Sequence, residues 1–104
     1  MVARIWRTQI DVTRADEYRR FAEEKSLPMF REQPGFAGVL FAANLAERAV
    51  ITLWRDLASA QGLDQSETYR RTVAEIEGTG FLRGNSSVEV FELEGLFMEN
   101  VSAT

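Results

Sequence analysis

The chain has 104 residues, of which 45% are hydrophobic and 27% are charged, and it contains neither histidine nor cysteine. These counts exclude disulfides, thiolate nucleophiles, imidazole bases and zinc sites of the His/Cys type, so any chemistry must use carboxylates, amides, hydroxyls, arginines and aromatic rings. The formal net charge of -4 argues against nucleic-acid binding, because neutralising phosphates requires a basic surface.

The length and composition favour one domain with a single hydrophobic core, which we place at residues 1–95, followed by a C-terminal tail at residues 96–104. Arg4 and Arg7 interrupt the apolar residues at the N-terminus, so no secretory signal is predicted. No later stretch approaches the roughly 20 apolar residues that cross a bilayer. We therefore expect a cytoplasmic protein without a membrane partner.

Residues 2–12 are rich in β-branched and aromatic side chains, which predicts a first strand. Apolar residues occur on both parities of this strand, so the pattern leaves open which parity faces the core. Thr13, with Asp16 three residues later, resembles a capping box and predicts the start of a helix.

The first helix is predicted over residues 14–33, because apolar residues repeat at helical spacing from Ala15 to Ala22. Pro28 disfavours the helical conformation at Leu27, so we expect a break or kink there. The helix stops at the Pro-Gly pair that follows residue 33.

Two strands are predicted over residues 36–43 and 49–54, joined by a hairpin connection in which Asn44 tolerates the left-handed conformation. Both strands carry apolar residues on both parities. Strands of this kind are covered on both faces, whereas an antiparallel sheet with one wet face alternates apolar and polar residues. The sheet therefore needs two covering layers.

The rest of the chain predicts two helices and a last strand. Asp56 is the N-cap of a short helix over residues 56–63, and Ser66 opens a longer helix that continues to residue 78. A glycine-rich loop at residues 78–84 then precedes a strand over residues 86–93.

The predicted elements follow the order strand-helix-strand-strand-helix-strand, which is the ferredoxin-like α+β arrangement with an antiparallel sheet. Its helices all lie on one face of the sheet. Because the second and third strands are apolar on both parities, the other face needs a partner's sheet or a ligand pocket, and we predict a homodimer through the sheet faces. The alternative is a monomer whose tail after Gly95 folds back over this face.

Three short motifs occur at corresponding places in these elements: ARIWR in the first strand, PGFAG before the second and TLWRD at the end of the third. Their order and spacing resemble the antibiotic biosynthesis monooxygenase family of dimeric α/β barrels. The resemblance spans residues 2–93. It implies a homodimer in which each subunit keeps a small-molecule cavity between its sheet and its helices.

Members of this family include monooxygenases that need neither flavin nor metal and oxidise phenolic polyketide or quinol-type substrates. The resemblance therefore implies an oxidoreductase without a cofactor or metal, with O₂ as co-substrate. A haem-degrading branch of the family uses a histidine ligand from the helical region and an asparagine on the first strand. That branch is disfavoured, because this chain has no histidine and carries Thr8 at the asparagine position.

Four residues are candidates for the site. Trp54 matches the tryptophan that lines the family's cavity near the end of the third strand, where it would stack on a flat substrate and orient it through its N–H. Thr8 or Tyr69 would donate a hydrogen bond to a developing oxyanion, and Trp6, on the same parity as Thr8, would contact the substrate. Core packing is the alternative for Trp54 and Tyr69, and strand propensity is the alternative for Thr8.

Charged residues are weaker candidates. Arg70 or Arg71 would pair with a phenolate or carboxylate, but neighbouring glutamates explain both as surface ion pairs. Glu89 and Glu92 have opposite parities, so they do not form a carboxylate pair on one face. The sequence therefore identifies no catalytic base.

The function predicted from the sequence is a cofactor-independent monooxygenase that oxidises a small electron-rich aromatic, such as an anthrone, a quinol or a polyketide-type phenol, in a hydrophobic cavity. Once deprotonated, such a substrate reduces O₂ itself, so the protein needs only to bind, desolvate and stabilise the anion. The alternatives are a non-catalytic small-molecule-binding dimer, and an isomerase or lyase that acts by proton transfer.

Overall fold

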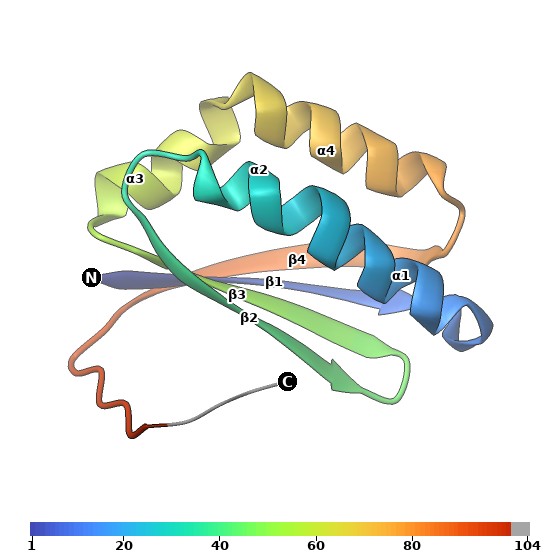
Figure 1. Cartoon of the computed structure of the whole chain (residues 1–104), viewed down its shortest axis with the longest axis horizontal. Helices are drawn as coiled ribbons and strands as arrows, with labels where there is room; N and C mark the ends of the chain where they lie inside the picture. The colour runs from blue at the N-terminus through green and yellow to red at the C-terminus, as the bar shows by residue number, and fades with distance from the viewer. Residues whose placement is uncertain (101–104) are drawn as a thin grey trace.

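A four-stranded antiparallel sheet forms one layer of the molecule, and the helices pack on one of its faces (Figure 1). The structure is a computed structural model in which residues 1–100 are described. In sheet order, the strands are β2 (Phe36–Asn44), β3 (Glu47–Trp54), β1 (Val2–Ile10) and β4 (Leu82–Glu92). The connections from β1 to β2 and from β3 to β4 carry the helices. This arrangement confirms the predicted ferredoxin-like α+β fold.

The helices are divided between these two connections. The first contains the 3-10 turn η1 (Val12–Arg14), α1 (Ala15–Phe21), the π-helical segment η2 (Ala22–Ser26) and α2 (Leu27–Arg31). The second contains α3 (Leu57–Gly62), the 3-10 turn η3 (Leu63–Gln65) and α4 (Glu67–Gly78). Within residues 1–100, every helix is too short or too polar to cross a membrane.

The chain stays helical past Pro28, so the break or non-helical residue predicted at Leu27 is wrong. The regular α-helix is nevertheless interrupted directly before Leu27, by the π-helical segment η2. Leu27 is helical, with φ -60° and ψ -50°, and its N–H bonds to the carbonyl of Ala22, five residues earlier. A π-type turn widens the helix, which relieves the clash between a proline ring and the carbonyl of the preceding turn. The segment η2 therefore carries the helix through Pro28.

Polar side chains cap the helical segments. Asp56 and Ser66 cap α3 and α4 as predicted, by accepting hydrogen bonds from backbone N–H groups of the first turn at 2.8 and 3.2 Å. The first helical turn is capped by Asp11 rather than by Thr13. The Asp11 carboxylate accepts from the hydroxyl and the backbone N–H of Thr13, and these hydrogen bonds lower the pKa of Asp11.

β4 begins at Leu82, before the predicted start at residue 86, because a bulge extends its pairing with β1. Arg7 lies opposite Ser87, but the next paired residue of β1 lies opposite Arg83, so β4 has extra residues at this point. Gly84 has φ 70° in this segment, a left-handed conformation that glycine adopts without strain. The end of the predicted glycine-rich loop is therefore part of the strand.

The hairpin between β2 and β3 has the two-residue turn Leu45-Ala46. Asn44 is the last residue of β2 and pairs with Glu47. The left-handed conformation expected at Asn44 occurs instead at Leu45, with φ 55°. The reason is that the positive φ angles of a two-residue hairpin fall at its central positions and not at the last paired residue.

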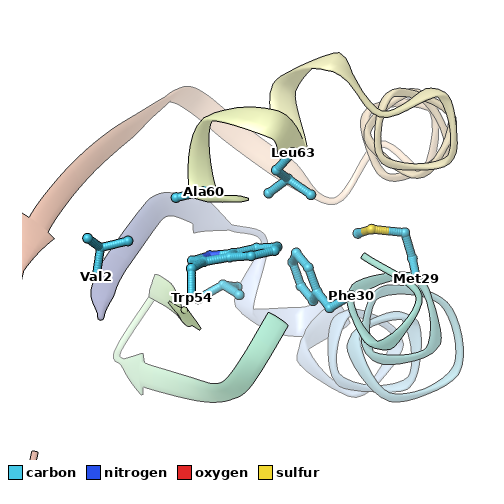
Figure 2. Packing of buried hydrophobic residues seen from close by; sticks show 7 residues of the cluster. Val2, Met29, Phe30, Trp54, Ala60 and Leu63 are labelled. Carbon is cyan, nitrogen blue, oxygen red and sulfur yellow. The ribbon is translucent and has the colours of Figure 1, made fainter. Parts of the chain in front are cut away.

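Even-numbered residues of β1 face the helices, which decides the parity that the sequence left open. Val2 belongs to a core cluster that joins the sheet to the helices (Figure 2), and Ile10 belongs to a second cluster further along β1. The buried members of the first cluster are Val2, Met29, Phe30, Val50, Trp54, Ala60 and Leu63, and those of the second are Ile10, Tyr18, Ile76 and Phe81.

The opposite face of the sheet, which we call the open face, is apolar and carries no helix in the described chain (Figure 1). Strand pairing places apolar residues of all four strands on it: Ile5, Leu40, Ile51, Leu53 and Phe91. Leu40 is 49% exposed and Phe91 is 48% exposed. Residues 1–100 therefore do not supply the second covering layer that the sequence requires.

The described part of the tail does not supply this layer. It leaves β4 on the side of the sheet away from the helices (Figure 1), and its residues Leu96, Phe97 and Met98 are exposed, Phe97 to 94%. Residues 1–100 therefore do not form the alternative arrangement, in which the tail folds back over the open face. Residues 101–104 of the predicted tail lie outside the described residues.

Candidate functional site

A cavity of about 90 Å³ lies between the sheet and the helices. Its floor includes Trp6, Val50 and Phe41, which strand pairing aligns in one row across β1, β3 and β2. Its other walls come from α1, η2, α2 and α4 and include Tyr18 and Tyr69. Aromatic and aliphatic side chains make up most of the lining, so the cavity is largely apolar.

Two residues with formal charge enter this lining, Arg4 from β1 and Glu77 from α4. Glu77 is exposed, whereas Arg4 is only 5% exposed. Water therefore screens the charge of Glu77, while the charge of Arg4 acts in a medium of low polarity.

The guanidinium of Arg4 links β1 to η3 and α4, in the helical segment between β3 and β4. Its Nη2 donates to the phenol oxygen of Tyr69 at 3.0 Å and to Oδ1 of Asp64 at 3.2 Å. Its Cζ lies 5.3 Å from the centre of the Tyr69 ring, within the range of a cation–π contact. These contacts place a cation and a phenol side by side in the wall of the cavity.

Tyr18 brings a second phenol to the lining from α1. Burial raises the pKa of Tyr18 to about 12, and the nearby charge of Arg48 opposes this rise only in part. The Cζ of Arg48 lies 5.8 Å from the centre of the Tyr18 ring. The phenol is therefore protonated at neutral pH and is available as a hydrogen-bond donor rather than as a base.

Of the four residues predicted for the site, Trp6 and Tyr69 are in the cavity lining. Trp54 is fully buried in the first core cluster (Figure 2), and it is not among the residues that line the cavity. Its Nε1 donates to the hydroxyl of Thr52 at 2.8 Å, and its ring packs edge-on against Phe36 with the centroids 5.7 Å apart. The indole N–H expected to orient a ligand is thus already used within the protein.

Thr8, the fourth predicted residue, shares the helix-facing parity of Trp6 but also lies outside the lining. It is buried, and its hydroxyl lies 3.5 Å from the carbonyl of Gln9. The structure therefore brings together two of the four predicted residues and leaves Trp54 and Thr8 in the surrounding packing.

The weaker charged candidates are on the surface. Arg71 pairs with Glu67 at 3.4 Å, one helical turn earlier, and Arg70 donates to the backbone carbonyl of residue 64 at 3.0 Å. Glu89 forms an ion pair with Arg7 on the open face. These positions agree with the interpretation of these residues as surface charges.

Three titratable residues of the lining were not proposed as site residues from the sequence: Arg4, Tyr18 and Glu77. Arg4 carries a signal in retrospect, because it lies between Val2 and Trp6 on the parity that faces the helices. Tyr18 was counted only as part of the apolar repeat of its helix. Glu77 carries no such signal, since it is one of several glutamates in this helix.

Solved structures of known proteins are similar to this chain. SnoaB from Streptomyces nogalater, a cofactor-independent oxygenase, is 16% identical, with a TM-score of 0.71 over 94% of this chain and 97% of its own. The monooxygenase ActVA-Orf6 of Streptomyces coelicolor, in complex with the ligand nanaomycin D, is 13% identical, with a TM-score of 0.74 over 95% of this chain and 92% of its own. The chain has the fold of the antibiotic biosynthesis monooxygenases.

The same fold also occurs in NE2512 of Nitrosomonas europaea, a protein of unknown function, which is 15% identical, with a TM-score of 0.75 over 94% of this chain and 93% of its own. No protein-family model matches the chain, and neither does any curated protein sequence. A shared fold hosts different activities, so the function has to be argued from the site.

Proposed function

We propose that this chain is a cofactor-independent monooxygenase that oxidises a small electron-rich aromatic, such as an anthrone, a quinol or a polyketide-type phenol. The observation that carries the proposal is the cavity between sheet and helices, whose apolar and aromatic lining includes the phenols of Tyr18 and Tyr69. The fold shared with SnoaB and ActVA-Orf6 supports the same class of reaction.

For an anthrone, the reaction converts a ring CH₂ group into a carbonyl. The deprotonated carbon gives one electron to O₂, the two radicals combine to a peroxide, and the protonated peroxide loses water. One oxygen atom of O₂ becomes the carbonyl and the other leaves as water, so no external reductant is needed. The protein contributes by binding the ring, excluding water and stabilising the oxyanion.

Trp6 and Tyr69 are the residues that we assign to direct substrate contact. Trp6 offers a flat apolar surface, and Tyr69 offers its phenol O–H to an oxygen atom of the substrate. Trp54 acts as a positioning residue, because it packs on Phe36, whose ring stacks at 6.0 Å on that of Phe30 in the lining. Thr8 supports the floor next to Trp6 on β1.

Glu77 is our candidate for the catalytic base, which the sequence left unassigned. It is the carboxylate of the described lining, and it comes from α4, as Tyr69 does. Because Glu77 is exposed, it exchanges a captured proton with water after each turnover.

We also propose that two copies associate through their open faces to complete a dimeric α/β barrel. The apolar residues of the open face, with Leu40 and Phe91 each about half exposed, form the kind of patch that marks an association surface. The Arg7–Glu89 ion pair lies on the same face and joins β1 to the edge strand β4. Two such faces packed together would supply the covering layer that one subunit lacks.

A second candidate function is a non-catalytic binder of small aromatic molecules. It is favoured by one observation, that burial moves the pKa of Tyr18, a lining phenol, to about 12 and thus away from the neutral range of acid–base catalysts. Such a protein would be stabilised by its ligand without consuming O₂.

The test is O₂ uptake by purified, metal-free protein against anthrones, quinols and simple phenols. We expect uptake that saturates with substrate at one O₂ per anthrone oxidised, and a lower rate in Trp6→Leu. Stabilisation by these ligands without uptake would instead support the binder. Product formation without O₂ would support an isomerase or lyase.

A further inference from the structure

Part of the guanidinium of Arg4 is not engaged by the protein. Its side chain makes two hydrogen bonds to the described residues, and Nη2 is the donor of both. Within residues 1–100, every side-chain nitrogen or oxygen of a buried residue either contacts solvent or has a hydrogen-bond partner. Nε and Nη1 therefore keep some contact with solvent, and because Arg4 belongs to the cavity lining, they are the candidate donors of this side chain for a molecule bound there.

Tyr69 places a second donor beside Arg4. Its phenol oxygen accepts the hydrogen bond from Nη2 of Arg4, which leaves its own O–H free to donate. A phenol that accepts from a cation is polarised and becomes a stronger donor. Arg4 and Tyr69 thus present two adjacent donors in one wall of the cavity.

The positive charge of Arg4 is only partly balanced inside the protein. Its ion-pair partner, Asp64, is 60% exposed in η3 and lies outside the cavity lining. The carboxylate of the lining, Glu77, follows Tyr69 by eight residues on α4, which is about 12 Å along the helix axis. A buried cation with a solvent-screened partner is poorly compensated, and an anion bound in the cavity would complete the pairing.

We infer, on the basis of the function proposed above, that the substrate is a planar aromatic carboxylate whose carboxylate group binds to Arg4 and Tyr69. Two adjacent donors match the two oxygens of a carboxylate. A carboxylate is ionised at neutral pH without help from the protein, whereas an ordinary phenol is not. Arg4 and Tyr69 hold the acid group and leave the ring against Trp6 and the apolar walls.

Isothermal titration calorimetry at pH 7 with 2-naphthoate and naphthalene-2-carboxamide tests this inference on the unmodified protein. The two probes share a ring and differ in charge. We expect 2-naphthoate to bind about tenfold more tightly, as for one hydrogen bond to a charged group. Equal affinity, or no heat from 2-naphthoate at about 1 mM, would overturn the inference.

Variants then locate the preference. In Arg4→Gln, the two probes should bind within about twofold of each other, while Arg71→Gln, which removes an exposed charge from α4, should keep the tenfold difference. Tyr69→Phe, which keeps the ring and the charge of Arg4, should reduce the difference about threefold, and it serves as the second test where circular dichroism finds Arg4→Gln unfolded. A full preference in a folded Arg4→Gln protein would be evidence against the site.

A third probe separates a carboxylate site from a phenol site. If 2-naphthol binds as tightly as 2-naphthoate and loses affinity in Arg4→Gln, the carboxylate assignment fails. These measurements use no O₂, so they fail or succeed apart from the oxygenase proposal. O₂ uptake with uncharged anthrones, together with no preference for 2-naphthoate, would overturn only the carboxylate inference. A preference for 2-naphthoate without any O₂ uptake would overturn only the oxygenase proposal.

Discussion

Arg4 and Tyr69 lie 65 residues apart in the chain, and Nη2 of Arg4 donates to the phenol oxygen of Tyr69 at 3.0 Å. The contact joins the central strand β1 to α4 and forms part of the cavity wall. It therefore has two consequences, one for stability and one for the ligand.

Tyr69→Phe should lower the free energy of unfolding by about 1–3 kcal/mol, because it removes the acceptor of a hydrogen bond from a buried charged group. Urea denaturation measures this change. Asp64→Asn is the matched control, since Asp64 is the other acceptor of the same Nη2. Because the Asp64 side chain is 60% exposed, this substitution should cost less than about 1 kcal/mol of stability. A larger loss in Asp64→Asn than in Tyr69→Phe would contradict the assignment.

Tyr18→Phe should reduce the loss of folding stability that the protein shows as the pH rises above about 10. Burial raises the pKa of Tyr18 from 10.0 to about 12, so the folded state holds the phenol proton more tightly than the unfolded chain does. This contribution is complete below about pH 10 and is lost as the pH rises towards 12, with a total of about 2–3 kcal/mol.

Urea denaturation at a series of pH values from about 9 to 11.5 compares the two proteins. The unmodified protein should lose stability more steeply than Tyr18→Phe across this range. Parallel curves would mean that the Tyr18 phenol ionises in the folded state as readily as in the unfolded chain.

The two tryptophans should respond differently to substitution. Trp54→Phe should cost about 1–3 kcal/mol of stability, because it shrinks a fully buried ring and leaves the Thr52 hydroxyl without its donor. Its affinity for 2-naphthoate should change by less than about threefold. Trp6→Leu removes a lining ring and should weaken binding by more than this. A larger loss of affinity in Trp54→Phe than in Trp6→Leu would mean that Trp54, rather than Trp6, contacts the ligand.

Leu40→Glu should convert the proposed dimer into a monomer, because it places a charge among the apolar residues of the open face. Size-exclusion chromatography with light scattering measures the mass. Val12→Glu is the control, since Val12 is 55% exposed on η1, away from the open face, and this variant should remain dimeric. A monomeric unmodified protein would disprove association through the sheet faces.

Glu77→Gln should reduce the rate of O₂ uptake with an anthrone by at least about tenfold if Glu77 is the base. Glu75→Gln is the control on the same helix: Glu75 lies near Lys25 on the surface and outside the lining, so its loss should leave the rate unchanged. Equal rates in the two variants would assign the proton transfer to another group or to water.

Local signals in the sequence predicted most of the fold. The caps at Asp56 and Ser66 and the apolar pattern of the strands act over a few residues, so they can be recognised in the chain itself. The errors arose where the folded structure accommodates a residue against its local conformational preference. Pro28 stays within the helix because a π-type turn accommodates it, and the bulge at Gly84 extends β4 into a segment that looked like a loop.

The site was less predictable, because it depends on contacts between distant parts of the chain. Trp6 and Tyr69 were recognised as aromatic residues at suitable places, and both line the cavity. Trp54 was chosen by resemblance, yet the hydroxyl of Thr52 takes its N–H and the core surrounds its ring. Whether an aromatic residue lines a cavity or fills the core depends on which neighbours pack over it, and a strand's own pattern does not contain that information.

By itself, the sequence determined the order of the elements, the absence of histidine and cysteine chemistry, and the presence of a sheet with two apolar faces. Only the tertiary structure decided which face of β1 meets the helices and that Arg4, Tyr69 and Asp64 come together. The physical reason is range: hydrophobic periodicity and capping act between near neighbours in the chain, whereas the pairing of a buried charge requires partners that only the packing of α4 on the sheet brings within hydrogen-bonding distance.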